Sequence, residues 1–150
     1  MILVAGIGNV FNRDDAFGVE VVRRLATRGL DGAQIVDFGI RGFDLALALT
    51  AGIDAAVLVD ASPRGGPAGT LYVLEPDDLR EAEVPDGHGI HPLRALALAR
   101  AIGGLPKFVR IVACEPEDVD EGEGLSAPVT AALKPAIDLV AAIVREASHA

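Results

Sequence analysis

The sequence predicts a three-layer α/β sandwich, with helices on both faces of a mostly parallel sheet. Three observations predict this class. Continuous apolar runs bounded by turn residues recur along the chain, as is typical of strands buried on both faces. Segments with the apolar spacing of amphipathic helices lie between these runs. Hydrophobic residues make up 51% of the 150 positions but aromatic residues only 4%, so the core must be largely aliphatic.

Five apolar runs are expected to form the strands. They are Ile2 to Ala5, Ile35 to Val36, Ala55 to Val59, Leu71 to Leu74 and Phe108 to Ala113. The fourth run follows the third through a Pro/Gly loop that is too short for a crossover helix. We therefore expect the fourth strand to be antiparallel to its neighbour.

Four helices are expected between and after these strands. They span Phe17 to Ala26, Phe43 to Thr50, His91 to Ile102, and a segment from near Ser126 toward Ala147. Ser126 is the expected N-cap of the last helix, and Pro135 should interrupt and kink it. The resulting order is β-α-β-α-β-β-α-β-α, which we interpret as a single domain over residues 1–150.

The charge and the single cysteine limit the classes of partner and compartment. The net charge of −9 arises from 22 acidic and 13 basic residues, and it disfavours nucleic acid and anionic lipid as partners. Cys114 ends an apolar run and is interpreted as a small core residue. No basic residue precedes the first apolar run, and no apolar run approaches the roughly 18 residues of a membrane span. We expect a cytoplasmic protein.

Two acidic loops hold 12 of the 22 acidic residues, one over residues 75–87 and one over residues 115–124. They are open to two interpretations. They are solvated loops that keep the protein in solution, or they form the rim of a cleft that attracts a basic or metal-bearing partner.

Polar residues that follow the apolar runs are the candidates for a functional site, because ligands of open α/β sheets bind beyond the carboxyl ends of the strands. Asp15, Asp60 and His88 follow three such ends. Two carboxylates and an imidazole suit a divalent transition metal, whereas a pair of aspartates that shares a proton suits acid–base hydrolysis. Each residue also has an ordinary structural interpretation, as a helix cap or a loop residue. His91 is open as a second ligand, a cap or neither.

A nucleotide-binding site is the alternative at the turn from Gly6 to Asn9. The Gly-x-Gly pattern follows a strand and precedes a helix, and Asp37 would then contact a ribose. However, Phe11 stands where the third glycine belongs. Asp14 and Asp15 would repel a phosphate. A serine hydrolase is disfavoured, because no Gly-x-Ser-x-Gly motif is present.

Four stretches of the chain together resemble the hydrogenase maturation endopeptidases. They are Ile2-Leu3-Val4-Ala5-Gly6-Ile7-Gly8-Asn9, Asp14-Asp15-Ala16-Phe17-Gly18-Val19, Leu58-Val59-Asp60-Ala61 and Gly87-His88-Gly89. The resemblance continues through Gly69-Thr70-Leu71 and Glu115-Pro116-Glu117 to the last helix. One departure is the turn from Asp37 to Gly42, where the family often has a Gly-Gly-Thr-like sequence and Arg41 instead offers a charge to a substrate chain.

The resemblance implies a fold of the phosphorylase/hydrolase-like type, with a twisted five-stranded sheet between helices. It implies an endopeptidase that removes the C-terminal extension of a nickel-iron hydrogenase large-subunit precursor after nickel insertion. Asp15, Asp60 and His88 would sense nickel that arrives with the precursor, and Asp15 and Asp60 would be catalytic in an aspartic-type or metal-assisted manner. A small-ligand or nucleotide-binding module and a non-catalytic maturation partner are the alternatives.

Overall fold

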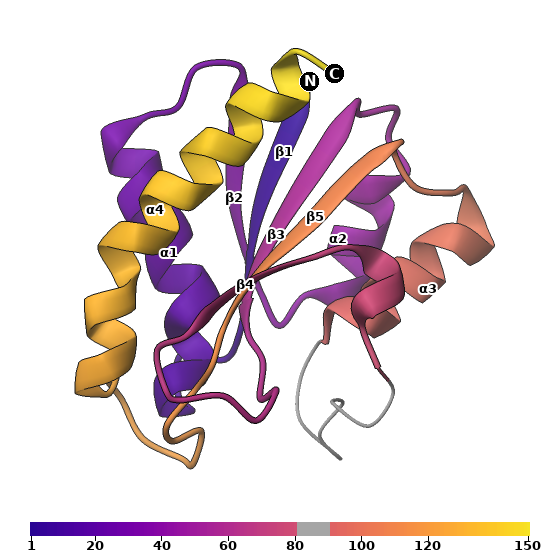
Figure 1. Ribbon diagram of the computed structural model, residues 1–150. Coiled ribbons are helices and arrows are strands. Elements are labelled where there is room, and N and C mark those ends of the chain that lie inside the picture. The colour runs from indigo at the N-terminus through magenta and orange to yellow at the C-terminus, as the bar shows by residue number, and fades with distance from the viewer. Residues whose placement is uncertain (81–90) are drawn as a thin grey trace.

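The computed structural model describes residues 1–80 and 91–150 (Figure 1). The strands are β1 (Ile2–Ile7), β2 (Ala33–Gly39), β3 (Ala55–Ala61), β4 (Leu71–Leu74) and β5 (Phe108–Cys114). The helices are α1 (Phe17–Arg28), α2 (Gly42–Leu49), α3 (Pro92–Ile102) and α4 (Ala127–Ser148), with short 3-10 turns η1 (Arg13–Ala16) and η2 (Pro76–Asp78). Each predicted strand and helix is present.

The five strands form one sheet in the order β2-β1-β3-β5-β4. All neighbours are parallel except β4, which pairs antiparallel with β5 as its short connection predicts. From β1 the chain passes to β2 on one side and then to β3 on the other. The carboxyl ends of β1 and β3 therefore form the topological switch point, where open α/β sheets bind their ligands.

Helices cover both faces of the sheet, with α1 and α4 on one side and α2 and α3 on the other (Figure 1). Alternate residues of β1 enter different cores, with Val4 on the face of α1 and α4 and Leu3 and Ala5 on the face of α2 and α3. Side chains of period two thus bury both faces of a central strand. The predicted three-layer α/β fold is confirmed.

Strand β2 is longer than the two apolar residues that predicted it. It is an edge strand of the sheet, and only Phe38 among its residues is buried. Gln34 is exposed and Asp37 is half-buried, because one side of an edge strand faces solvent. A search for continuous apolar residues finds the full length of central strands, but it finds only the apolar middle of an edge strand such as β2.

Helix α4 runs through Pro135 without a break, so the prediction that this proline interrupts the helix is wrong. Proline removes one backbone hydrogen bond, to the carbonyl of Ala131 four residues earlier. Both residues lie on the exposed face of α4, where water can satisfy that carbonyl. The apolar face of the helix continues past the proline through Ala136 and Val140, and its packing outweighs the lost hydrogen bond.

Helix α4 also corrects the expectation about membrane spans. Its 22 residues are long and apolar enough, by length and composition, to cross a bilayer. The expectation counted only uninterrupted apolar runs, and this helix reaches the threshold with Lys134 and Asp138 on its exposed face. Its apolar side chains, among them Val129, Leu133 and Val140, pack against α1 and one face of the sheet.

Candidate active site

Asp60 is the residue of β3 just before its carboxyl end, and its side chain is only 4% exposed. Burial raises the pKa of this carboxyl well above its usual value, because a buried carboxylate loses its hydration. The negative charge of Asp15 raises the pKa of Asp60 further, and a hydrogen bond from the backbone of Ala61 opposes the shift. Burial and the nearby charge of Asp15 thus both favour the protonated form of Asp60.

Asp15 lies in η1, the turn that follows β1. Its Oδ2 accepts a hydrogen bond of 2.9 Å from the backbone N–H of Asn9, and its own backbone N–H donates to the carbonyl of Asn12 at 3.0 Å. The turn packs tightly onto Gly8, where an added Cβ would lie 1.8 Å from the carbonyl oxygen of Asp15. Gly8 has a φ of 145°, which favours glycine. Glycine at position 8 therefore allows the backbone of Asp15 to pack against the residue that follows β1.

The structure therefore brings two of the three predicted site residues together at the switch point. Asp15 and Asp60 interact electrostatically, and η1 packs against β3. His88, the third predicted residue, lies outside the described residues. Across residues 1–80 and 91–150, no three His, Cys, Asp or Glu side chains form a group that suits a metal ion.

His91 acts as a cap for α3. Its side chain is 5% exposed, and its Nδ1 accepts a hydrogen bond of 3.1 Å from the backbone N–H of Leu93. Pro92 occupies the first position of the helix, where no N–H is needed. Of the interpretations that the sequence left open for His91, the cap is the one that its hydrogen bond supports.

Asp14, the neighbour of Asp15, has a different role. It is fully buried, and its carboxylate accepts hydrogen bonds from the N–H groups of Glu117, Asp118 and Ser126 and from the Ser126 hydroxyl, at 2.7 to 3.0 Å. Burial works to raise the pKa of Asp14, but these hydrogen bonds outweigh it and hold the pKa below its usual value. Ser126 precedes α4 as predicted, yet its hydroxyl binds Asp14 and makes no cap hydrogen bond to the helix.

Glu115 is a third buried carboxylate, in the segment that was expected to form an acidic loop. It is 5% exposed, and it accepts hydrogen bonds from the N–H groups of Arg64 and Gly66 and from the hydroxyl of Tyr72, at 2.8 to 3.1 Å. Its position directly after residues 111–114, the buried apolar end of β5, is the signal that predicts burial. Burial, followed by the charges of Asp14 and Glu115, raises the pKa of the adjacent Cys114 thiol to about 12, which fits an inert core residue.

The glycine turn after β1 does not suit a phosphate. The N–H of Gly8 donates to the carbonyl of Gly39 at 3.0 Å, and the N–H of Asn9 donates to Asp15. A bound phosphate needs such N–H groups to be available. Asp37, the candidate for a ribose, instead accepts a hydrogen bond of 3.3 Å from Arg23. These contacts argue against the nucleotide-binding alternative.

Arg41 was expected to contact a substrate chain. Its side chain instead contacts residues just before it in the sequence. Its Nη2 donates to the carbonyl of Asp37 at 2.6 Å, and its guanidinium lies over the ring of Phe38, 5.7 Å from the ring centre. The side chain remains more than half exposed, so one side of the guanidinium still faces solvent.

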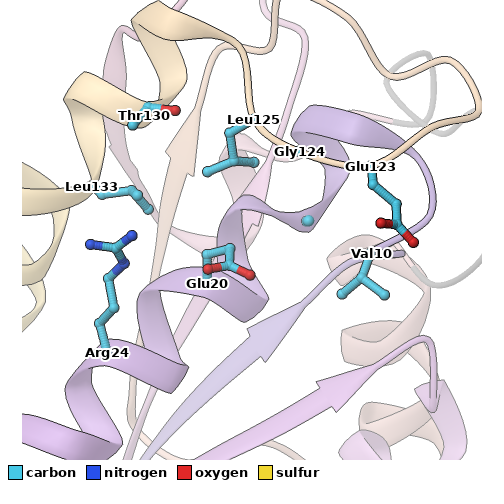
Figure 2. Close-up of a pocket in the computed structure, with 9 residues that line it drawn as sticks. Val10, Glu20, Arg24, Glu123, Gly124, Leu125, Thr130 and Leu133 are labelled. Atoms are coloured by element: carbon cyan, nitrogen blue, oxygen red, sulfur yellow. The ribbon is translucent and has the colours of Figure 1, made fainter.

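A groove of about 400 Å³ lies beside the end of β1, on the face of α1 and α4 (Figure 2). It is lined by Val10, Ala16, Glu20, Arg24, Glu123, Gly124, Leu125, Thr130 and Leu133. Figure 2 shows Glu20 and Arg24 on successive turns of α1, below the loop that carries Glu123. The groove therefore combines an apolar lining with charges of both signs, and it adjoins the turn that carries Asp15.

The fold defines an α/β protein with two aspartates at the switch point of its sheet, where proteins of this class bind ligands. Comparisons with known proteins identify it further. Residues 19–143 match the family model described as hydrogenase maturation protease (HycI). Hydrogenase 2 maturation protease of Escherichia coli K12 is 33% identical to this chain over 97% of the chain and 91% of that protein.

Solved structures agree with these matches. The hydrogenase maturating endopeptidase HybD from E. coli has a TM-score of 0.78 at 32% identity and covers 97% of this chain and 92% of its own. A hydrogenase 2 maturation peptidase from a Thaumarchaeota archaeon has a TM-score of 0.72 at 32% identity, with 95% and 97% covered. The chain belongs to the hydrogenase maturation protease family, and it is an endopeptidase of hydrogenase maturation.

Proposed function

We propose that this endopeptidase removes the C-terminal extension of a nickel-iron hydrogenase large-subunit precursor that already holds nickel, and that Asp15 and Asp60 form the centre that recognises the precursor and cuts it. The observation that carries the proposal is the burial of Asp60 beside Asp15 at the topological switch point. The substrate follows from the family, to which relatives named for hydrogenase maturation belong.

The donor set suits a divalent cation carried by the substrate. Two carboxylates lie at the carboxyl ends of β1 and β3, and their mutual repulsion adds to the effect of burial in raising the pKa of Asp60. A positive charge between them relieves that repulsion and favours the ionised form of both groups. His88 is the third residue proposed to bind the nickel, by the family motif and by its ligand type. Nickel is part of the substrate in this proposal, so the free enzyme need not hold it.

A second mechanism is supported by the same pKa shift. A protonated Asp60 beside an ionised Asp15 forms an acid–base pair of the aspartic type, in which Asp15 activates a water molecule and Asp60 protonates the leaving group. The nickel then identifies the mature precursor without entering the cleavage step. Binding and cleavage by variants of the two aspartates distinguish the mechanisms.

The proposal is tested with two forms of one precursor, loaded with nickel or free of it. We expect the mass of the loaded precursor to fall by that of its C-terminal extension, while the metal-free precursor stays intact. Cleavage of both forms at the same rate would contradict nickel recognition. Failure to cut either form would contradict the proposed substrate. We also propose that the protein is cytoplasmic, and fractionation of the source cells tests this location.

A further inference from the structure

We propose that Asp14 and Glu115 are positioning residues that, through the segment from Cys114 to Ser126, fix the loops carrying Asp15 and Asp60 relative to each other. This inference rests on the proposed catalytic role of Asp15 and Asp60. We call this segment the brace. It joins β5 to α4, and it lies between the loop after β1 and the loop after β3.

Asp14 attaches the brace to the loop after β1. Its carboxylate binds both ends of the acidic part of the brace, with Glu117 and Asp118 at one end and Ser126 at the other. The backbone makes the same connection, because the N–H of Asp14 donates to the carbonyl of Asp118 and the N–H of Arg13 donates to that of Gly122, each at 3.0 Å. Asp15 is the next residue along this chain.

Glu115 attaches the brace to the loop after β3. Its carboxylate accepts the N–H groups of Arg64 and Gly66. Its backbone N–H donates to the carbonyl of Thr70 at 2.8 Å, and its carbonyl accepts the N–H of Gly69 at 2.8 Å. The loop over residues 62–70 is thereby held around Glu115 on both sides. This loop begins two residues after Asp60.

The two attachments are close together along the brace. Glu115 and Glu117 are separated only by Pro116, whose ring fixes one backbone angle. A shift of either loop must therefore displace the other or break hydrogen bonds to a buried carboxylate. Buried carboxylates that lose their donors are costly, so the arrangement resists such shifts. Asp14 is fully buried and Glu115 nearly so, which places both away from contact with a substrate.

The inference is tested with Asp14→Asn and Glu115→Ala, and with the milder variants Ser126→Ala and Tyr72→Phe. Each mild variant removes one hydrogen bond to one carboxylate. Hydrogen exchange of backbone amides reports the brace directly. We expect faster exchange at Glu117, Asp118 and Ser126 in Asp14→Asn, and at Arg64 and Gly66 in Glu115→Ala.

Cleavage of the nickel-loaded precursor reports the consequence. Because misplacement of a reacting group by about 1 Å can cost about 100-fold, we expect kcat to fall by about 10- to 100-fold in the two strong variants, with KM changed less than about threefold. The mild variants should show a smaller loss of kcat. Val144→Ala, in the core at the far end of α4, is the matched control for a loss of stability alone. At a temperature where all variants are folded, it should leave kcat unchanged.

Three other outcomes would overturn the positioning role of the brace. If amide exchange accelerates while kcat stays at the wild-type value, the brace does not position the aspartates. A rise of KM with kcat unchanged also overturns the inference, since the brace is then a docking surface only. If the strong variants do not fold, a wild-type kcat in both mild variants overturns it. Failure of the wild-type protein to cleave the precursor rejects the proposed function instead, and amide exchange still tests the brace.

Discussion

Burial raises the pKa of Asp60, near the end of β3, and the charge of Asp15, in the turn after β1, raises it further. The topology causes this proximity, because β1 and β3 are parallel neighbours whose carboxyl ends meet at the switch point. Burial of Asp60 beside the partly buried Asp15 opposes folding, and proteins retain such arrangements at functional sites. The stability and the activity of this protein should therefore respond in opposite directions to changes at Asp60.

Replacement of Asp60 by asparagine should stabilise the protein at pH 7. The folded pKa of Asp60 lies above its unfolded value, so the folded state holds the proton more tightly. The wild-type protein therefore loses stability as the pH rises from about 4 toward the folded pKa, at about 1.4 kcal/mol for each unit between the two pKa values. Asp60→Asn does not lose stability in this way, so its free energy of unfolding should exceed that of the wild type at pH 7 and equal it near pH 4. Urea unfolding at pH 4 and pH 7 measures the difference, with the exposed Asp31→Asn as control.

Gly8→Ala should destabilise the protein by more than about 3 kcal/mol, because the added Cβ meets the carbonyl of Asp15 and the backbone angle is strained. Gly52→Ala is the matched control. Its φ of 78° is also positive, but nothing lies within 4 Å of an added Cβ. We expect it to cost about 1 to 2 kcal/mol. Equal losses in the two variants, measured by urea unfolding, would show that the contact between Gly8 and Asp15 is unimportant.

Charge reversal in the acidic part of the brace should slow association with the precursor. Glu121 and Glu123 are exposed, and Glu123 borders the groove of Figure 2. Exposed charges steer encounter and contribute little to folding, so Glu121→Lys with Glu123→Lys should lower the association rate about tenfold at low salt. The same reversal at Asp31 and Glu146, which are exposed and lie outside the brace, is the control. Equal association rates for the two double variants would indicate that the acidic residues of the loop serve only solubility.

Substitutions of His88 and His91 should have different effects on stability and on precursor binding. His91→Ala removes the cap of α3 and should cost about 1 kcal/mol of unfolding free energy, with His91→Asn closer to wild type because asparagine also caps helices. His88→Ala should weaken binding of the nickel-loaded precursor. A loss of precursor binding in His91→Asn would contradict this assignment.

The sequence predicted the sheet because aliphatic runs in central strands leave few alternatives, and it predicted the antiparallel β4 from one short loop. It did not predict the hydrogen bonds of Asp14, since adjacent residues in a turn point to different surroundings that only the tertiary structure defines. The hydroxyl of Ser126 is a similar case, because a local helix cap and a distant carboxylate compete for it. Glu115 belongs to a loop whose sequence suggested either a solvated loop or the rim of a cleft, although its place after the buried end of β5 predicts burial.

The most direct test of the paired aspartates measures binding and cleavage of the nickel-loaded precursor separately in Asp15→Asn and Asp60→Asn. If the pair binds nickel in the precursor, both variants should remain folded, bind the precursor at least about tenfold more weakly and fail to cut it, because an amide is a poorer metal ligand than a carboxylate. Wild-type binding with cleavage abolished would instead support the acid–base mechanism. Wild-type binding and cleavage in both variants would contradict any role of Asp15 and Asp60 in the reaction.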